Sequence, residues 1–416
     1  MKTNLKTLKG FRDLLPEEAA IKQEVINCLR TTFESFGFHP VETPTIEYSR
    51  TLLGNYGKSA EKLVYTFKDK GNRSVGLRYD LTVPICKVMG MYRNEITLPF
   101  KRYQIQNVFR ADKPQKGRYR EFTQCDIDIF GVNSPLADGE IIAVTYTALM
   151  NLGFKQFTIN INSRKVLYQI LENASITDKN KQLKTLQIID KLDKKPKRAV
   201  EEELSLVLSS KTAKCVFNEI EKAKPNKDLE AIFSYLKLCK IPTNYYQFRP
   251  SLVRGLDYYT GAIFETTVSK PKVGSITGGG RYNNLISTLG GPDISGTGVT
   301  IGLERIMEAI KENNLWRKRP DKKSVLVTIF SPDLETNSIT LAQALRGEGI
   351  NTELYLDSGA KLEKQFKYAD RKNISWATII GPDEAKKGKV ILKNLESRSQ
   401  KLVSQKELLK ILKNNS

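Results

Sequence analysis

Histidine is almost absent from this sequence, because His39 is the only one among 416 residues. It stands beside Pro40 in a turn-like FGFHP segment, which favours a structural role. Serine–histidine triads, histidine metal sites and histidine general bases all require a histidine in the reacting centre. We therefore expect an enzyme with this sequence to work by positioning and charge.

Cysteine and long apolar runs are also scarce. The five cysteines form no CxxC pair, which argues against a zinc site and against a disulfide framework. No apolar run approaches the roughly 18 residues of a membrane span, and the start, MKTNLKTLKGFRD, has no apolar signal core. These features predict reduced thiols, no membrane partner and a cytoplasmic protein. The cysteines are Cys28, Cys86, Cys125, Cys215 and Cys239.

Positive charge, in contrast, is in large excess. The 67 lysine and arginine residues outnumber the 46 aspartate and glutamate residues, and the formal net charge is +21. Such an excess favours a polyanionic partner such as nucleic acid, and solvated lysine-rich helices are the alternative explanation. At about 100 to 200 residues per domain, the chain has room for two or three domains.

Residues 102–131 carry the clearest local pattern. Polar and apolar residues alternate over two stretches, which predicts antiparallel strands joined by a loop. The alternating sets are Tyr103, Ile105, Asn107 and Phe109 and then Phe122, Gln124, Asp126 and Asp128. In the second strand Cys125, Ile127 and Ile129 fall on the other face, so the polar side chains point together into one space.

The loop between these predicted strands is basic. Pro114 and Gly117 mark a turn, and five cations lie close to it. This arrangement suits a polyphosphate, and a charged hairpin tip on a solvated surface is the alternative interpretation. The cations are Arg110, Lys113, Lys116, Arg118 and Arg120.

The wording of several segments is similar to that of one known family. FRADKPQKGRYREFTQCDIDIFG resembles the second signature motif of class II aminoacyl-tRNA synthetases, and of histidyl-tRNA synthetases in particular. RGLDYYTG, residues 254–261, resembles a string peculiar to that family. GVTIGLERIMEAI, residues 298–310, resembles the third class II motif. Further resemblances extend over nearly the whole chain.

The resemblance implies an α/β protein with a catalytic domain of α+β type on a mainly antiparallel sheet, a helical insertion and a C-terminal anticodon-binding domain. It implies a histidine–tRNA ligase that uses ATP, with Mg²⁺ carried by the nucleotide and no dedicated protein metal site. Histidine would pass to the 3′ end of tRNA(His). A homodimer is implied too, because the helix near residues 10–36 and the FHPVETPTIEYS strand resemble the first class II motif. A core helix with an ordinary edge strand is the alternative.

Individual roles follow from the same resemblance. The implied catalytic residues are Arg110, Arg254 and Arg305. Histidine would be bound by Asp80, Thr82, Gln124, Asp128, Arg254, Tyr258, Tyr259 and Tyr282, with Asp128 meeting the imidazole. ATP would be bound by Arg110, Asp112, Phe122 and Arg305, and Gln115 and Arg118 are candidates for contact with the tRNA acceptor end. A helix-capping Asp80 and a structural Arg254 are the alternatives.

Composition suggests where the domains begin and end. We expect a catalytic domain over residues 1–310, with a helical insertion at about 175–240, where Lys, Glu and Leu dominate. We expect a polar linker over residues 311–324 and an anticodon-binding domain over 325–416. Strand and helix alternate from 325 to 382, which predicts a parallel sheet with crossover helices, and KVILKNL, residues 389–395, is a further expected strand. Cations on or beside one helix there predict phosphate contacts or, alternatively, a solvated surface. They are Lys361, Lys364, Lys367, Arg371 and Lys372.

Two other functions fit parts of the resemblance. An ATP phosphoribosyltransferase regulatory subunit is synthetase-like but charges no tRNA, and such proteins usually lack the anticodon domain and the RGLDYYTG string. A synthetase-like RNA-binding or kinase-associated regulatory module would be expected to lose Arg110 or Arg305. The sequence retains the string and both arginines.

Overall fold

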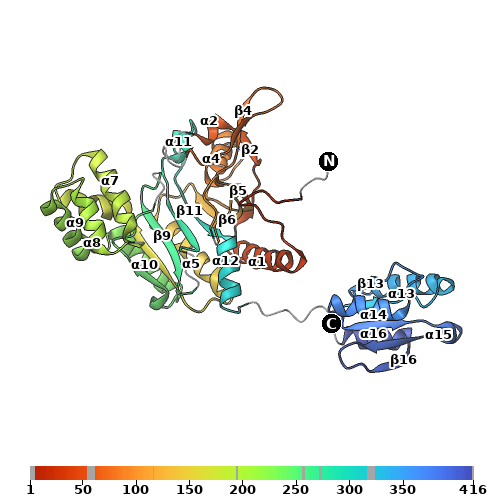
Figure 1. The fold of residues 1–416 in the computed structure, drawn as a ribbon. Helices are drawn as coiled ribbons and strands as arrows, with labels where there is room; N and C mark the ends of the chain where they lie inside the picture. The colour runs from red at the N-terminus through yellow and green to blue at the C-terminus, as the bar shows by residue number, and fades with distance from the viewer. Residues whose placement is uncertain are drawn as a thin grey trace. The chain divides into compact units, whose positions relative to one another are not determined.

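The computed structural model describes residues 5–53, 61–115, 117–193, 195–254, 258–270, 274–315 and 324–414. The chain divides into two compact units, Met1–Trp316 and Arg317–Ser416, each with its own sheet and buried core (Figure 1). The predicted α/β architecture is confirmed. Lys116, Asp257 and residues 316–323 of the expected linker lie outside the described residues.

The first unit is built on an eight-stranded sheet. Its strands are β1 (His39–Pro40), β5 (Phe100–Phe109), β6 (Glu121–Phe130), β7 (Phe157–Ser163), β8 (Tyr246–Phe248), β9 (Ala262–Val268), β10 (Thr277–Arg281) and β11 (Gly296–Gly302). Their order is β1-β5-β6-β11-β10-β9-β7-β8, and only β1 with β5 and β7 with β8 pair in parallel. The predicted mainly antiparallel sheet is confirmed, and β5 and β6 are the predicted hairpin.

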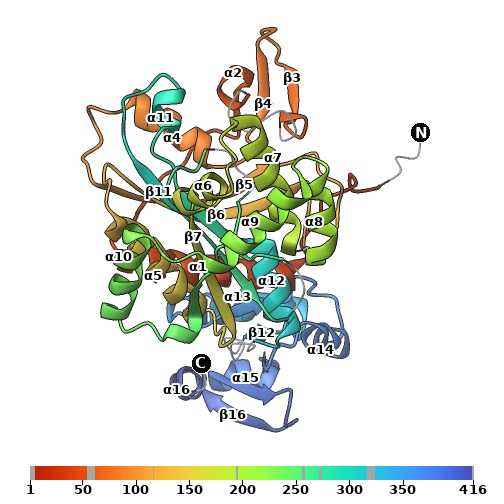
Figure 2. The same cartoon turned by 90° about the vertical axis from the view of Figure 1, so that its left-hand side faces the viewer.

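A smaller sheet lies at one end of the large one (Figure 2). It consists of β2 (Ile46–Tyr48), β3 (Thr66–Lys68) and β4 (Ser74–Leu77) in the order β2-β4-β3, and short helix α2 (Ser49–Leu52) follows β2. Asn72 takes a positive φ of 57° in the turn between β3 and β4, as the turn signals predict. Helix α4 (Thr82–Met91) then leads back towards the large sheet, and α11 (Leu285–Thr288) packs on α4.

Three helices pack together on one face of the large sheet: α1 (Pro16–Ser35), α5 (Pro135–Asn151) and α12 (Leu303–Glu312). Pro16 begins α1, followed by Glu17 and Glu18 in the first turn, which favours a helix start. The sheet face that these helices cover is apolar. Residues that pair across neighbouring strands lie on the same face, so the apolar residues form rows. One such row is Tyr103, Ile127, Val299, Gly279, Phe264 and Ile161.

The region expected to be a helical insertion consists of helices in the described residues (Figure 1). Each helix buries an amphipathic stripe; α9, for example, buries Ala213, Val216, Phe217 and Ile220. Helix α10 packs on α5 and so joins this group to the sheet. The helices of this region are α7 (Lys179–Ile189), α8 (Lys197–Ser205), α9 (Ser210–Lys222) and α10 (Lys227–Leu238), and α6 (Arg164–Asn173) directly precedes it and packs on α7 and α9.

The second unit holds a five-stranded sheet in the order β13-β12-β14-β15-β16. Strands β12 (Val325–Val327), β13 (Thr352–Leu354) and β14 (Trp376–Ile379) are parallel, as predicted, with α13 (Glu335–Gly347) and α14 (Leu362–Arg371) as crossovers. The further expected strand is present as β15 (Lys389–Asn394), and it pairs antiparallel to β14. Only short helix α15 (Pro382–Lys387) precedes β15, and a parallel return needs a dozen or more residues. Antiparallel β16 (Gln400–Ser404) and α16 (Gln405–Lys413) complete the unit.

Candidate active site on the open face of the large sheet

The face of the large sheet opposite α1 and α5 carries polar side chains in register. The β5–β6 pairing sets Arg102 opposite Asp128, Gln104 opposite Asp126 and Gln106 opposite Gln124. Tyr103 and Ile105, which the sequence alternation singles out in β5, pair instead with residues of the apolar core face. The polar face of β5 therefore consists of residues that sequence reasoning missed, although their alternation was visible.

Glycines in β10 and β11 make room for charged side chains on this face. A Cβ atom added at Gly298 would lie 1.9 Å from Oδ1 of Asp128. One added at Gly278 would lie 2.1 Å from Nη2 of Arg254. Any larger residue would displace these two groups. The glycine-rich segment thus allows close approach by the protein's own side chains.

A buried polar group, which we call the carboxyl pocket, consists of Arg102, Gln124, Asp126, Asp128 and Tyr282. Nη2 of Arg102 lies 2.5 Å from Oδ2 of Asp128, and the Tyr282 hydroxyl donates to the other Asp128 oxygen. Burial raises the pKa of Asp128, while the Arg102 charge and the Tyr282 hydrogen bond act in the opposite direction. Asp128 is therefore held between the charge of a buried arginine and the hydroxyl of a buried tyrosine.

The residues expected to bind the histidine amino group adjoin the carboxyl pocket. Oδ1 of Asp80 accepts a 3.0 Å hydrogen bond from the backbone N–H of Val83 at the start of α4, so Asp80 caps the helix as well as lying buried. The hydroxyls of Thr82 and Tyr258 hydrogen-bond to each other. The Tyr258 ring lies 4.8 Å from the Tyr259 ring and 5.8 Å from the Tyr282 ring, centroid to centroid. Segments far apart in the sequence thus meet in one pocket.

Four guanidinium groups, which we call the arginine cluster, lie beyond the carboxyl pocket: Arg110, Arg118, Arg254 and Arg305. The Arg110 guanidinium carbon lies 4.2 Å from the Tyr79 ring centroid and 5.1 Å from that of Phe122. Burial lowers the pKa of Arg305, and repulsion from Arg118, Arg254 and Arg110 lowers it further. The mutual repulsion means that the cluster has an excess of positive charge, which suits a polyphosphate.

Glu265 on β9 connects two of these arginines, and sequence reasoning missed it. Its Oε2 accepts from Nη1 of Arg254 at 3.0 Å and from the Ser275 hydroxyl at 2.6 Å. Nη1 of Arg305 donates to the Ser275 backbone oxygen at 2.5 Å. One buried carboxylate therefore positions Arg254 directly and Arg305 through Ser275. The available signal was an acid within an otherwise apolar and threonine-rich strand, AIFETTV.

The loop between β5 and β6 holds the remaining expected site residues. The Asp112 carboxylate pairs with the Arg118 guanidinium at 2.8 and 2.9 Å. The backbones of Gln115 and Arg118 hydrogen-bond to each other at 3.0 and 2.9 Å, and Gly117 takes a positive φ of 69°. The predicted turn is confirmed. Gln115 and Arg118 are exposed, so both are available to a large partner.

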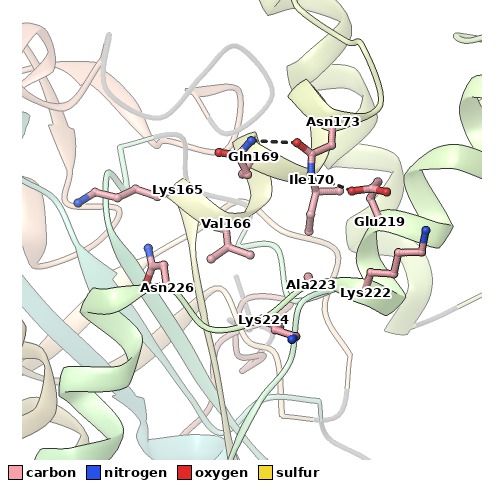
Figure 3. A pocket seen from close by; sticks show the side chains of 10 residues that line it. All are labelled: Lys165, Val166, Gln169, Ile170, Asn173, Glu219, Lys222, Ala223, Lys224 and Asn226. Carbon is pink, nitrogen blue, oxygen red and sulfur yellow. Dashed lines mark hydrogen bonds between the residues drawn. The ribbon is translucent and has the colours of Figure 1, made fainter.

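A separate cavity of about 430 Å³ lies among α6, α9 and the start of α10 (Figure 3). Figure 3 shows the Lys165 and Lys222 side chains extending in opposite directions, while Asn173 hydrogen-bonds with Gln169 and Glu219. Its charged groups do not converge on one point, so it does not resemble the sheet-face site.

In the seven described segments, no group of three or more His, Cys, Asp and Glu residues could hold a metal ion. No helix in those segments is long and apolar enough to cross a membrane.

An antiparallel sheet with one arginine after the central hairpin strand, one at the start of a following helix and a polar pocket between them defines the catalytic domain of a class II aminoacyl-tRNA synthetase. The family description "Histidyl-tRNA synthetase" matches residues 10–306, and "Anticodon binding domain" matches residues 324–415. This chain belongs to the histidyl-tRNA synthetase family.

Whole-chain similarities agree with the family assignment. A histidine–tRNA ligase from Helicobacter hepaticus is 38% identical over 421 residues, which cover 95% of each chain. The crystal structure of histidyl-tRNA synthetase from Nostoc sp. PCC 7120 superposes with a TM-score of 0.85 at 28% identity and covers 100% of both chains. Apo histidyl-tRNA synthetase from S. aureus gives 0.74 at 25% identity, covering 99% of this chain and 100% of that one.

Proposed function

We propose that this chain activates histidine with ATP and transfers it from the adenylate to tRNA(His). The observation that carries the proposal is that the carboxyl pocket and the arginine cluster adjoin on one sheet face. Tyr259 lies between them: burial raises its pKa, the Arg254 charge opposes this shift, and the charges of Asp128 and Asp126 add to it. A small polar substrate and a polyphosphate can therefore meet there.

In the first step, an oxygen of the histidine carboxylate forms a bond to the α-phosphorus of ATP. The bond from that phosphorus to the bridging oxygen breaks, and pyrophosphate leaves with the bond's electron pair. The nucleophile is already an anion, so no general base is needed. Arg110, Arg254 and Arg305 hold the phosphates in line and offset their charge, and Mg²⁺ enters with the nucleotide. Phe122 and Asp112 are proposed to contact the adenine.

We propose that the site holds histidine at two places, its ammonium group and its imidazole ring. Asp80 and Thr82 are proposed to take the ammonium group, with Tyr258 closing over it, and Gln124, Asp128 and Tyr282 to surround the imidazole. A site that must hydrogen-bond its substrate can reject a near-isostere by roughly 10⁴ to 10⁵, because its buried groups are otherwise left unpaired. This supports selection without an editing domain.

Transfer to tRNA is proposed to use both units. The exposed Gln115 and Arg118 lie on the loop beside the arginine cluster, where an acceptor end could reach the adenylate. We propose residues 1–310 as the catalytic domain with an insertion at 175–240, and residues 325–416 as the anticodon-binding domain. Charging of tRNA also supports a cytoplasmic location.

A homodimer is proposed through the region of β1 and β2. Large apolar side chains are exposed there and nearby, with Met91 at 64%, Ile46 at 49% and Tyr48 at 45% exposure. A hollow of about 510 Å³ beside β1 is lined by His39, Ile96 and Phe100 among others. Apolar exposure of this kind is typical of an interface. Light scattering should report about twice 47.1 kDa, and a fully active monomer would contradict the proposal.

ATP–pyrophosphate exchange with and without histidine tests the proposed activity. Exchange that depends on histidine supports a synthetase. A regulatory subunit or an RNA-binding module would show no exchange under conditions where the protein is folded and binds histidine or RNA.

A further inference from the structure

Asp126 lies in the centre of the carboxyl pocket and has no role in the scheme above. It pairs with Gln104 across β5 and with Thr300 across β11, and only 1% of it is exposed. The Thr300 hydroxyl hydrogen-bonds to the Asp126 carboxyl and accepts from Nε2 of Gln124 at 3.2 Å. Its backbone position on β6, two residues before Asp128, puts both carboxyls on the same face.

Besides Oδ2 of Asp128, which is ion-paired with Arg102, two buried acceptor atoms of the pocket receive no hydrogen bond within the described residues: Oδ1 of Asp126 and Oε1 of Gln124. Buried polar atoms in native proteins are nearly always paired, so orphaned atoms on neighbouring positions of one strand indicate where a polar ligand binds. Both atoms belong to side chains on the open face of the sheet.

The charges of the pocket do not balance if every group is ionised. Arg102 is fully buried and contacts Asp128, which leaves Asp126 as a second carboxyl without its own cation. Two neighbouring carboxyls in a dry site cannot both ionise cheaply. Burial raises the pKa of Asp126 to about 8, with Arg102 opposing and Asp128 adding to the shift. Asp126 is thus the carboxyl that keeps its proton.

A neutral imidazole ring has one N–H donor and one acceptor nitrogen. An ionised carboxyl accepts a hydrogen bond from the N–H, and a protonated carboxyl donates one to the acceptor nitrogen. We propose that Asp126 is a further specificity-determining residue, which as the neutral acid donates to the second ring nitrogen of histidine while ionised Asp128 accepts from the first. Arg102 is then a positioning residue that keeps the proton off Asp128. This inference rests on the proposed function, because it concerns the substrate of the same site.

Substitution of Asp126 tests the donor. Asp126→Leu removes the donor and should raise the KM for histidine in ATP–pyrophosphate exchange about 10- to 100-fold, with the KM for ATP within about threefold. Asp126→Asn has nearly the same shape and keeps an N–H donor, so its KM for histidine at pH 7 should stay within about threefold of wild type. Isothermal titration of histidine gives the same comparison without catalysis.

The pH dependence supplies an independent readout. The charged and titratable groups that face Asp126 are Arg102 from β5, Asp128 from β6, Asp80 before α4 and Tyr259 before β9. Below pH 8 Asp126 is protonated and can donate, and above pH 8 it ionises and loses the donor. Wild-type affinity for histidine should therefore fall on the order of tenfold per pH unit above 8 relative to Asp126→Asn, whose amide does not titrate. The ratio of variant to wild type cancels ionisation of histidine itself.

Asp138→Asn is the matched control, because Asp138 is a buried carboxyl with a raised pKa that pairs with Arg281 on the α5 side of the sheet. It should keep the wild-type alkaline loss of affinity. A histidine KM within threefold of wild type in Asp126→Leu, or an unchanged alkaline limb in Asp126→Asn, overturns the inference. Absence of histidine-dependent exchange in the wild type instead overturns the proposed function, so the two failures are distinguishable.

Discussion

The carboxyl pocket and the arginine cluster share one sheet face but differ in burial and in charge balance. In the pocket, Arg102 and Asp128 are buried and paired at 2.5 Å. In the cluster, the guanidinium groups repel one another, and 47% of the Arg118 side chain is exposed. A buried, matched pocket penalises every ligand that leaves its groups unpaired. A cationic cluster instead attracts phosphate of any source and acts through charge. We therefore propose that the first region selects the substrate and that the second sets the rate.

The two regions differ in whether their charged groups can change protonation. Arginine cannot lose its proton in proteins, so repulsion within the cluster cannot be relieved by neutralisation. A carboxyl in the pocket can take a proton instead, as the pKa of Asp126, raised to about 8, indicates. The cluster therefore keeps its positive charge and its affinity for anions.

The largest effect should follow from Asp128→Ala. The variant removes the ring contact, which costs about 2 to 4 kcal/mol, or on the order of 30- to 1000-fold in kcat/KM for histidine. ATP binding should change little because we propose that the nucleotide binds at the arginine cluster. Exchange kinetics with varied histidine and varied ATP measure both.

Asp128→Asn separates the substrate contact from the ion pair with Arg102, because it retains the shape and the oxygen that Tyr282 reaches. We expect an intermediate loss. If Asp128→Ala stays within threefold of wild type for histidine, Asp128 has no part in ring recognition. Thermal unfolding of each variant reports the separate cost of leaving buried Arg102 without its carboxylate.

Arg254→Ala should lower the rate of adenylate formation about 100-fold with little change in the dissociation constant of histidine. The cation would meet charge that grows on the α-phosphate as pyrophosphate departs, so it acts on the transition state. Single-turnover kinetics at saturating substrates measure the rate. Arg254→Lys keeps the charge and should recover part of it. An unchanged rate in Arg254→Ala would make the residue a structural one.

Glu265→Gln should have a smaller effect of about 10-fold on the same rate, because it loosens Arg254 and Arg305 without removing either. The loss should appear in kcat more than in the KM for histidine. Glu265→Asp, which keeps the charge at a shorter reach, should fall between the wild type and Glu265→Gln. Equal loss of histidine affinity in both variants would place Glu265 in the pocket rather than behind the cluster.

The sequence allowed much of this architecture to be predicted, because alternation, prolines and cap residues are local signals. The β5–β6 hairpin, α1 and α4 are examples. It did not reveal Arg102 or Glu265 as site residues, since each acquires its role only through pairing across strands, with Asp128 and over Gly278. The strand β15 was predicted but its direction was left open, because strand direction depends on the length of the connection and not on the strand's own residues.

The smallest change in histidine activation is expected when the second unit is removed. A chain that ends near Ser324 retains every residue of the pocket and the cluster, and each unit has its own core. ATP–pyrophosphate exchange with histidine should therefore remain within about threefold of wild type, provided that the shortened protein is folded and dimeric. Charging of tRNA should fall strongly. Loss of exchange in a folded, dimeric protein would show that the units do not act separately.

The salt dependence of tRNA binding decides what the second unit contributes. On α14, Lys364 pairs with Asp357 at 3.1 Å and Lys367 with Glu363 at 2.7 Å, and Lys372 pairs with Glu353. These pairs are exposed, and such pairs are worth about 0 to 1 kcal/mol, so phosphates can replace the carboxylates. Each phosphate contact should add roughly 0.7 to 0.9 logarithmic units per decade of salt. Removing the unit should lower that slope, as should Lys361→Ala with Arg371→Ala in the full chain. An unchanged slope in both would mean that these cations only solvate the helix.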